Sequence, residues 1–305
     1  MVSRFHCTFV ADMRYLKRIL VAVLCVLGAM DVSAQDVSFP FPEVPALMTD
    51  TQTRLKFMLE NFWNRYDFAD GSQYNVQVGE QGFSEFISLM PYADAPTQKL
   101  AVTNLMKKIG KDMGLLKRFD SLVDHYLGNP NSPLRNDMTY EQMLKGLLAS
   151  TLWDDATRSR LNYRLKMVQR NQPGTLAADF EYVDRVGRRH TLYEFQSSLT
   201  LVVFSDPECE HCHELMPKII GSKVIAGDRR LKVLSIYPDE NVRAWMQLRR
   251  TLPRNWSEGR SPNGKLMRDQ TFFLMAMPSL YLLDKDKRVI LKDATLEQVE
   301  KYLAP

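Results

Sequence analysis

The spacing of apolar residues changes once along this chain of 305 residues, and that change constrains the fold. Up to residue 171, apolar side chains recur every three or four positions, which is typical of helices with one buried face. After "NQPG" at 171–174, short apolar runs alternate with turn residues, as in strands. We therefore predict an all-α domain over 43–171 and an α/β domain with a central sheet over 175–305.

The first of these parts is expected to contain a series of amphipathic helices. One covers 53–68, the next stops at Pro91, a third runs from about Pro96 to Gly110, and a fourth ends at Gly128. The next helix is expected to open at a capping box of Thr139 and Gln142, and Leu161, Leu165 and Val168 mark the last one. We interpret the aromatic and methionine stripes of these helices as core rather than as a cofactor site, because their spacing alone requires a buried face.

The second part alternates between expected strands and helices. "DFEYVDRVGRRHTLYEF" reads as a β-hairpin, and a helix is expected from Cys209 to Ile220. Another helix is expected at "NVRAWMQL" and a last one at "TLEQVEKYL". The remaining expected strands are "LTLVVFSD", "LKVLSIY", "SLYLLD" and "RVILKD".

The N-terminus has the pattern of a secretory signal peptide. Basic residues precede the apolar run "ILVAVLCVLGAM", and small residues at Val32 and Ala34 follow it. We predict a signal peptide over 1–34, location in the periplasm or cell envelope, and no stable transmembrane segment after cleavage. Cleavage would remove Cys7 and Cys25 and leave Cys209 and Cys212 as the cysteines of the mature chain.

The formal net charge of +4 is small for this length, and no long basic cluster occurs, so we expect no nucleic-acid partner. Cys209 and Cys212 form a C-x-x-C pair in "FSDPECEHCHELMP". A disulfide that closes so short a loop restrains the unfolded chain very little. We therefore expect the pair to serve chemistry rather than stability.

The order of these features resembles exported thioredoxin-like thiol–disulfide oxidoreductases of the TlpA/ResA type. A buried strand leads into the C-x-x-C at a helix start, Pro217 follows inside that helix, and Pro278 directly precedes "SLYLLD". The resemblance covers about residues 176–303 and implies an α/β thioredoxin-like fold with Pro278 in the cis form beside the cysteines. The all-α part resembles a helical domain of unknown function found ahead of such domains.

The resemblance and the residues together predict a thiol–disulfide oxidoreductase that uses a dithiol/disulfide couple and needs no cofactor. Cys209 at the helix start is expected to attack, because unpaired N–H groups and the helix dipole favour an anion there. Cys212, one turn on, would resolve the mixed disulfide. Cys209, Cys212 and Pro278 are the expected catalytic residues, and Met277 would present its backbone to the substrate.

Neighbouring charges are expected to tune the thiols, in directions that oppose one another. His211 would favour the thiolate, whereas Glu208 and Glu210 would disfavour it. The choice between oxidant and reductant depends on this balance and stays open. The sequence also departs from the family: Glu208 replaces the usual Trp, Val203 the buried acid of thioredoxins, and Leu215 a frequent Glu.

Two alternatives use the same cysteines. "CEHCH" is also the attachment pattern of c-type haem, with His213 as the axial ligand. Cys209 and Cys212 could instead hold copper or zinc with His190 or His213. We favour protein thiols and disulfides as substrates, an electron-transfer partner in the membrane or envelope, and a role in envelope redox homeostasis, with the helical domain docking a partner or shaping substrate access.

Overall fold

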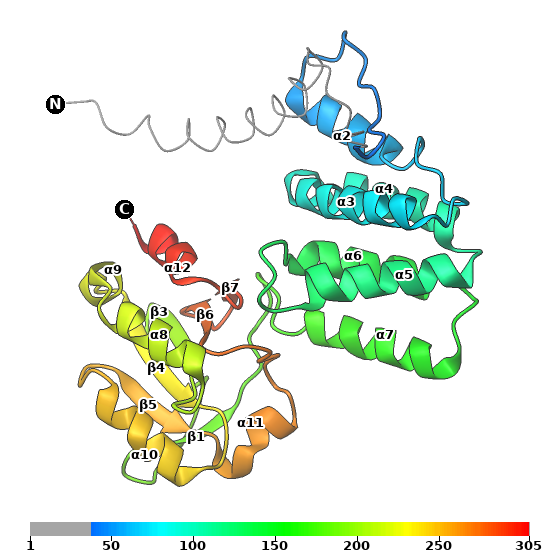
Figure 1. The fold of residues 1–305 in the computed structure, drawn as a ribbon. Helices are drawn as coiled ribbons and strands as arrows, with labels where there is room; N and C mark the ends of the chain where they lie inside the picture. The colour runs from blue at the N-terminus through cyan, green and yellow to red at the C-terminus, as the bar shows by residue number, and fades with distance from the viewer. Residues whose placement is uncertain (1–37, 305) are drawn as a thin grey trace, which may run out of the picture. The chain divides into compact units, whose positions relative to one another are not determined.

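The computed structural model describes residues 38–304, apart from the Tyr74 side chain. The expected signal peptide, residues 1–34 with Cys7 and Cys25, lies outside the described residues. Figure 1 shows a run of helices followed by a region of strands and helices. No helix within 38–304 has both the length and the apolar character that a membrane crossing requires.

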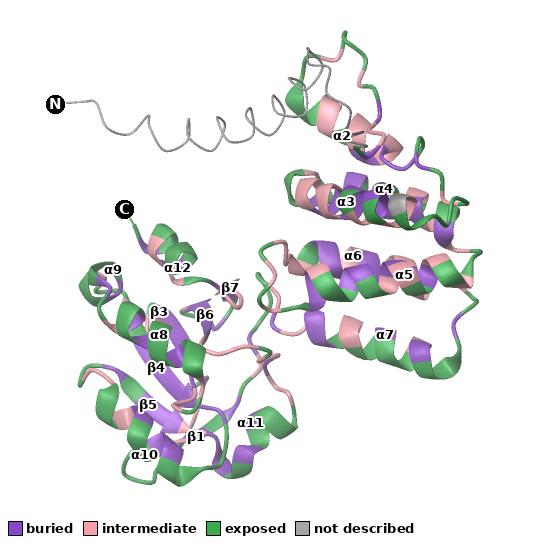
Figure 2. Ribbon diagram, viewed as in Figure 1, coloured by how far each residue is buried: buried purple, intermediate pink, exposed green. Residues whose placement is uncertain are grey.

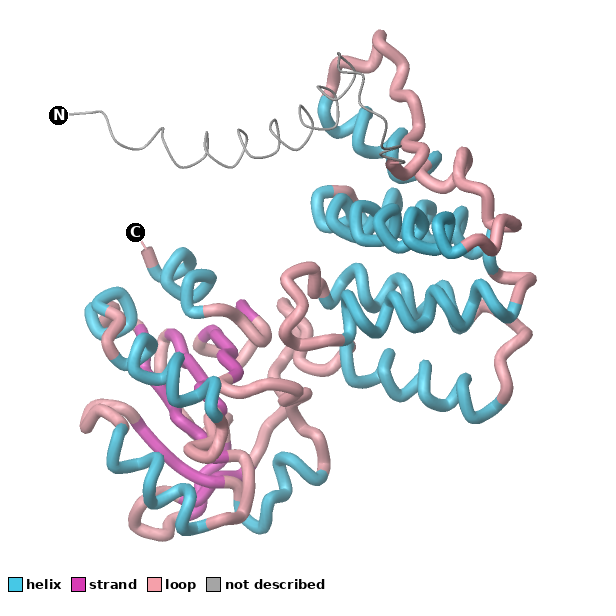
Figure 3. The backbone as a smooth tube through the Cα atoms, in the orientation of Figure 1, coloured by secondary structure: helices cyan, strands magenta, loops and turns pink. Residues whose placement is uncertain are grey.

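Helices form the described chain as far as Val168, as Figure 3 shows. The α-helices are α2 (Thr51–Asn61), α3 (Gln73–Leu89), α4 (Ala95–Ile109), α5 (Met113–Val123), α6 (Asp137–Leu148) and α7 (Asp155–Val168). A 3-10 turn, η1 (Met90–Tyr92), follows α3, and a π-helical turn, η2 (Asp124–Gly128), follows α5. The all-α character predicted for this part is confirmed.

These helices begin where a short polar side chain accepts a backbone N–H of the first turn. Such a side chain satisfies one of the N–H groups that a helix start leaves without an intrahelical partner. The capping residues are Asp50, Ser72, Asp94, Asp112, Asn136 and Asp154. The predicted capping box at Thr139 is therefore wrong: Thr139 lies inside the first turn of α6, and Asn136 Oδ1 accepts its N–H at 2.9 Å.

The first predicted helix is shorter than its apolar pattern. α2 ends at Asn61, whereas Phe62, Trp63 and Tyr66 lie beyond it and are still buried. They surround the Phe39 ring, which is itself 1% exposed. α3 comes so close to this ring that a Cβ at Gly82 would overlap it. The apolar spacing thus predicted correctly which residues are buried, but the predicted helix extends beyond the actual end of α2.

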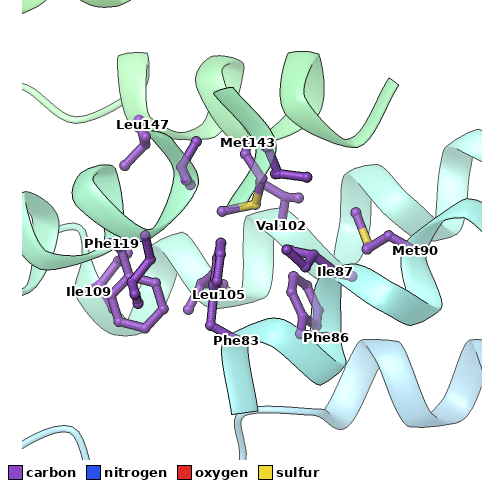
Figure 4. Close-up of a cluster of buried hydrophobic side chains, with 14 of the residues drawn as sticks. Phe83, Phe86, Ile87, Met90, Val102, Leu105, Ile109, Phe119, Met143 and Leu147 are labelled. Atoms are coloured by element: carbon purple, nitrogen blue, oxygen red, sulfur yellow. The ribbon is translucent and has the colours of Figure 1, made fainter. Parts of the chain in front are cut away.

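The helical part has one apolar core, to which its helices all contribute buried residues (Figure 4). Phe83, Phe86 and Ile87 of α3 meet Val102 and Leu105 of α4 in this core. The labelled residues from α5 and α6 are Phe119, Met143 and Leu147. The aromatic and methionine stripes are therefore core, as expected.

A sheet of seven strands with mixed directions organises the rest of the described chain, in the order β2-β1-β5-β4-β3-β6-β7. The strands are β1 (Glu181–Val183), β2 (Arg189–Thr191), β3 (Leu199–Phe204), β4 (Leu231–Tyr237), β5 (Ser257–Arg260), β6 (Ser279–Asp284) and β7 (Val289–Leu291). β3, β4 and β5 are parallel neighbours, and the other pairings are antiparallel. The predicted α/β character of this part is confirmed.

Alternate residues of the central strands contribute to two separate cores, because successive side chains point to opposite faces of a sheet. Leu201 and Val203 of β3 pack with α8 (Glu210–Ile220), α9 (Lys223–Gly227) and α12 (Leu296–Leu303). Val202 and Phe204 face the other cluster, which includes Leu266 of α11 (Lys265–Arg268). Figure 2 shows these strands as buried, and α10 (Val242–Thr251) covers the end of β4 through Trp245.

The predicted hairpin is present as β1 and β2. Asp184 Oδ1 accepts the N–H groups of Val186 and Arg188, and Gly187 adopts the positive φ of 85° that glycine tolerates. The sequence analysis missed α9, β5, α11 and the short η3 (Pro262–Gly264). β5 has no apolar alternation, and the structure holds it as a strand between β1 and β4.

Candidate dithiol site

The C-x-x-C segment lies between the end of the central strand β3 and the first turn of α8. β3 is buried along its whole length, and the five residues 205–209 connect it to the helix. Cys209 is the N-cap of α8, with an extended backbone and no hydrogen bond from its side chain to the first turn. The sulfur of Cys209 thus lies at the helix end where backbone N–H groups have no intrahelical partner.

The second part of the site is the loop before β6. The Met277–Pro278 peptide bond is cis, which agrees with the form that the resemblance implied. Cys209 Sγ donates a hydrogen bond of 3.4 Å to Met277 O. Cys209, Met277 and Pro278 therefore meet, although 68 residues separate Cys209 from Met277.

Cys212 lies one turn further into α8 and faces the core. Its side chain is 2% exposed and packs in the same cluster as Val203 and Leu280. Burial raises the pKa of the Cys212 thiol to about 12, and the neighbouring Cys209 thiol adds to this effect. Both cysteines are free thiols in the structure, so this geometry belongs to the reduced form.

Asp206 is a site residue that the sequence analysis missed. Its backbone N–H donates to Cys212 Sγ at 3.5 Å, and this bond lowers the pKa of Cys212, against the larger effect of burial. Its carboxylate accepts the Glu208 N–H at 2.8 Å. An aspartate three residues before the first cysteine, at the end of a buried strand, was the available signal.

The charged residues proposed to tune the thiols lie on the exposed side of the helix start. Glu208, Glu210 and His211 are exposed. His211 Nδ1 lies 3.8 Å from Glu214 Oε2, with both side chains more than half exposed, so this ion pair is weak. Glu208 also contributes, with Asp206 and Asp239, to a pKa of about 12 for the buried Tyr237 at the end of β4, where burial is the main cause.

The structure does not bring His190 to the cysteines. His190 lies on β2, four strands away from β3 in the sheet order, which corresponds to roughly 19 Å at the usual strand spacing. Its Nε2 lies 3.0 Å from Asp184 Oδ2, and its ring stacks on Tyr182. His213 is closer to the cysteines, and its Nε2 contacts Pro207 O.

The apolar residues ahead of Pro278 divide between core and surface. Phe272 is 1% exposed, and its ring packs at a tilt against Phe204 and edge-to-face against Tyr281 in the core. Met275 is 42% exposed, and Met277 is half-buried against the cluster that holds Cys212. Next to the cis peptide bond, Met275 is therefore the exposed apolar side chain of this group, and Phe272 belongs to the core.

Comparison with known proteins covers both parts of the chain. A family model described as a domain of unknown function, DUF5106, matches residues 25–171. A thioredoxin-like protein from Bacteroides caccae is 30% identical, with a TM-score of 0.83 over 88% of this chain and 98% of that one. The C-terminal domain of an uncharacterized protein from Bacteroides fragilis is 41% identical over 44% of this chain and 99% of its own length, with a TM-score of 0.43. No curated protein matches the chain.

Proposed function

Because this chain belongs to the thioredoxin-like family, and in a form that carries a helical domain ahead of the thioredoxin fold, we propose that it is a thiol–disulfide oxidoreductase of the cell envelope. The observation that carries the proposal is the meeting of Cys209 Sγ with Met277 O at the cis-proline loop, 3.4 Å apart, while Cys212 lies buried one turn away. Its substrates are protein disulfides or thiols, and an envelope electron-transfer protein restores its redox state.

The position of Cys209 supports its role as the attacking residue. The Cys209 thiolate attacks one sulfur of a substrate disulfide, so that a Cys209–substrate bond forms and the other substrate sulfur leaves as a thiolate. The N–H groups at the start of α8 favour the negative charge on Cys209 before this attack. Met277 O, beside the sulfur, is available to an extended substrate backbone.

The burial of Cys212 supports its role in resolving the mixed disulfide. Cys212 loses its proton and attacks Cys209 Sγ, which releases the substrate with two electrons and leaves a Cys209–Cys212 disulfide. The departing substrate thiolate is a base that accepts this proton, and the Asp206 N–H at 3.5 Å stabilises the charge on Cys212. The same steps in reverse oxidise a substrate dithiol.

The burial of Cys212 also favours this reading over haem attachment, because side chains of the core fill the space around its sulfur where a haem would have to sit. A metal site that includes His190 is disfavoured by the four-strand separation from β3. The envelope location depends on the basic and apolar pattern of residues 1–34.

Trapping of mixed disulfides tests the proposal. The Cys212→Ser protein, produced in the cell envelope, is expected to accumulate disulfide-linked partners on non-reducing gels, because Cys209 attacks and nothing releases it. The Cys209→Ser/Cys212→Ser protein is the matched control and should accumulate none. A wild-type protein that neither reduces nor oxidises insulin disulfides, together with empty trapping gels, would refute the proposal, and a Soret band would point to haem.

A further inference from the structure

A chain of polar contacts joins the helical part to the loop that carries the cis peptide bond. Arg135 Nη1, just before α6, lies 2.6 Å from Asp293 Oδ2. The other carboxylate oxygen, Asp293 Oδ1, accepts a hydrogen bond of 2.8 Å from Ser279 Oγ. Ser279 directly follows Pro278, and Met277 O accepts the bond from Cys209 Sγ. A guanidinium of the helical part is thus linked to the sulfur at the start of α8.

The members of this chain are shielded from solvent. The Arg135 and Asp293 side chains are 14% and 15% exposed, and Ser279 is 1% exposed. Salt screens a partly buried ion pair less than an exposed one, and hydrogen bonds to charged groups are about twice as strong as those between neutral groups. The contacts therefore restrain the loop more than surface contacts would.

Asp293 is held on its backbone as well as on its side chain. Its φ of 48° lies in the left-handed region, which aspartate tolerates better than most residues. The next residue, Ala294, donates its N–H to Leu280 O at 2.9 Å. Ser279 in turn pairs with Phe204, the last residue of β3. The backbone of Asp293 is therefore fixed beside Ser279, and the direction of its carboxylate depends on its side-chain partners, Ser279 and Arg135.

A second ion pair fixes the same loop to the helical part. Lys292, 3% exposed, lies 2.7 Å from Asp137 Oδ2 and donates to Val168 O at 2.6 Å. A buried ammonium group is stable only when a carboxylate and hydrogen-bond acceptors surround it. Lys292 therefore anchors the residues after β7 to Asp137 of α6 and to Val168 of α7. Burial raises the pKa of Tyr281 on β6, and the charges of Asp293 and Asp137 raise it further, whereas Arg135 opposes them. These charges therefore gather beside β6.

We propose that the helical domain positions the cis-proline loop, with Arg135 as the positioning residue that acts through Asp293 and Ser279. The proposal rests on the oxidoreductase function proposed above. Without Arg135, the partly buried Asp293 carboxylate would lose the guanidinium that lies 2.6 Å from it, and it would turn toward other donors or toward water. Ser279 would then lose its partner, and the loop that accepts the substrate backbone would lose its fixed distance from Cys209.

The reduction of insulin disulfides by the full mature chain, with dithiothreitol as the reductant, tests this role. We expect Arg135→Met to raise KM about tenfold with a smaller change in kcat, since the loop binds substrate, and Arg135→Lys to recover most of the loss. Arg170→Met is the matched control: it removes a hydrogen bond of 2.9 Å to Asp269 O, also between the two parts of the chain but away from the loop. Its KM should stay within twofold of wild type.

A double variant tests whether Arg135 acts through Ser279. Ser279→Ala should raise KM about as much as Arg135→Met, and the double variant should be no worse than either, because both changes break the same link. Multiplying effects, or an equal loss in Arg170→Met, would overturn the proposal. An inactive wild type refutes the oxidoreductase itself, whereas an active wild type with an unchanged Arg135→Met refutes only this inference. If Arg135→Met does not fold, Arg135→Gln replaces it in the same comparison.

Discussion

The two cysteines should differ greatly in reactivity, and the difference follows from the burial of Cys212. Burial raises the pKa of its thiol from 9.0 to about 12. At neutral pH the thiolate, which is the species that reacts with iodoacetamide, is then roughly a thousandth as abundant as in the unfolded chain. In the Cys209→Ser protein the effect of burial remains and the smaller effect of Cys209 is removed. We therefore expect Cys212 in this variant to be alkylated roughly a hundredfold to a thousandfold more slowly when folded than when unfolded in guanidinium chloride.

Mass spectrometry of the alkylated protein over time measures both rates. The folded rate should rise roughly tenfold for each pH unit above neutrality, as the thiolate population rises toward the raised pKa. The Cys212→Ser protein is the control, and its half-buried Cys209 should react readily while folded. This prediction would be refuted if folded Cys212 reacted within tenfold of the unfolded rate and if dilute urea did not change that rate. The second condition excludes reaction through transient unfolding, so the sulfur of the folded protein would itself be accessible and ionised.

Three further predictions concern stability. Leu105→Ala, in the core of the helical part, should lower the free energy of unfolding in urea by about 2–5 kcal/mol, while Leu100→Ala on the exposed side of the same helix should change it by less than about 1 kcal/mol. Asn136→Ala should cost about 1 kcal/mol by removing the cap of α6, whereas Gln142→Ala, which a capping box at Thr139 would make equally costly, should have little effect. The pKa of Tyr237 is raised from its ordinary 10.0 to about 12 in the folded state. The stability that depends on the neutral phenol is therefore complete below pH 10 and is lost as the pH rises toward 12. Tyr237→Phe should reduce the loss of unfolding free energy that urea titrations measure between about pH 8 and pH 11.

The sequence predicted those elements whose burial shows directly in the residue pattern. β3, β4, β6 and the core helices have apolar residues at the spacing of their own secondary structure. β5 has none: its Glu258 is 5% exposed and is paired with Arg185 at 2.9 Å and Arg249 at 3.4 Å. A strand that depends on neighbouring strands and distant arginines leaves no local signal.

Helix ends were predicted less well than helix faces. The apolar spacing from Leu55 to Tyr66 continues past the end of α2, because residues beyond Asn61 are buried by a turn of the chain rather than by a helix. Likewise, Thr139 and Gln142 have the residue types of a capping box, but the helix is capped by Asn136, three residues earlier. Asn136 can also accept a backbone hydrogen bond, and it accepts the N–H of Thr139.

At the site, the order of motifs predicted that the C-x-x-C and Pro278 would be neighbours, because a family resemblance fixes topology. The contact between Arg135, Ser279 and Asp293 could not be predicted, since three distant segments supply it and each residue alone is an ordinary polar residue. Polar contacts of this kind depend on the packing of the completed chain.

The enclosure of Phe39 by Phe62, Trp63 and Tyr66 has a practical consequence for anyone who expresses this protein. The Phe39 ring packs directly against Gly82, in space that a side chain there would need. A recombinant protein should therefore begin at or before Phe39. A protein that begins after Phe39 would lack one ring of this aromatic cluster. We expect it to fold less stably and to give a lower yield of purified protein.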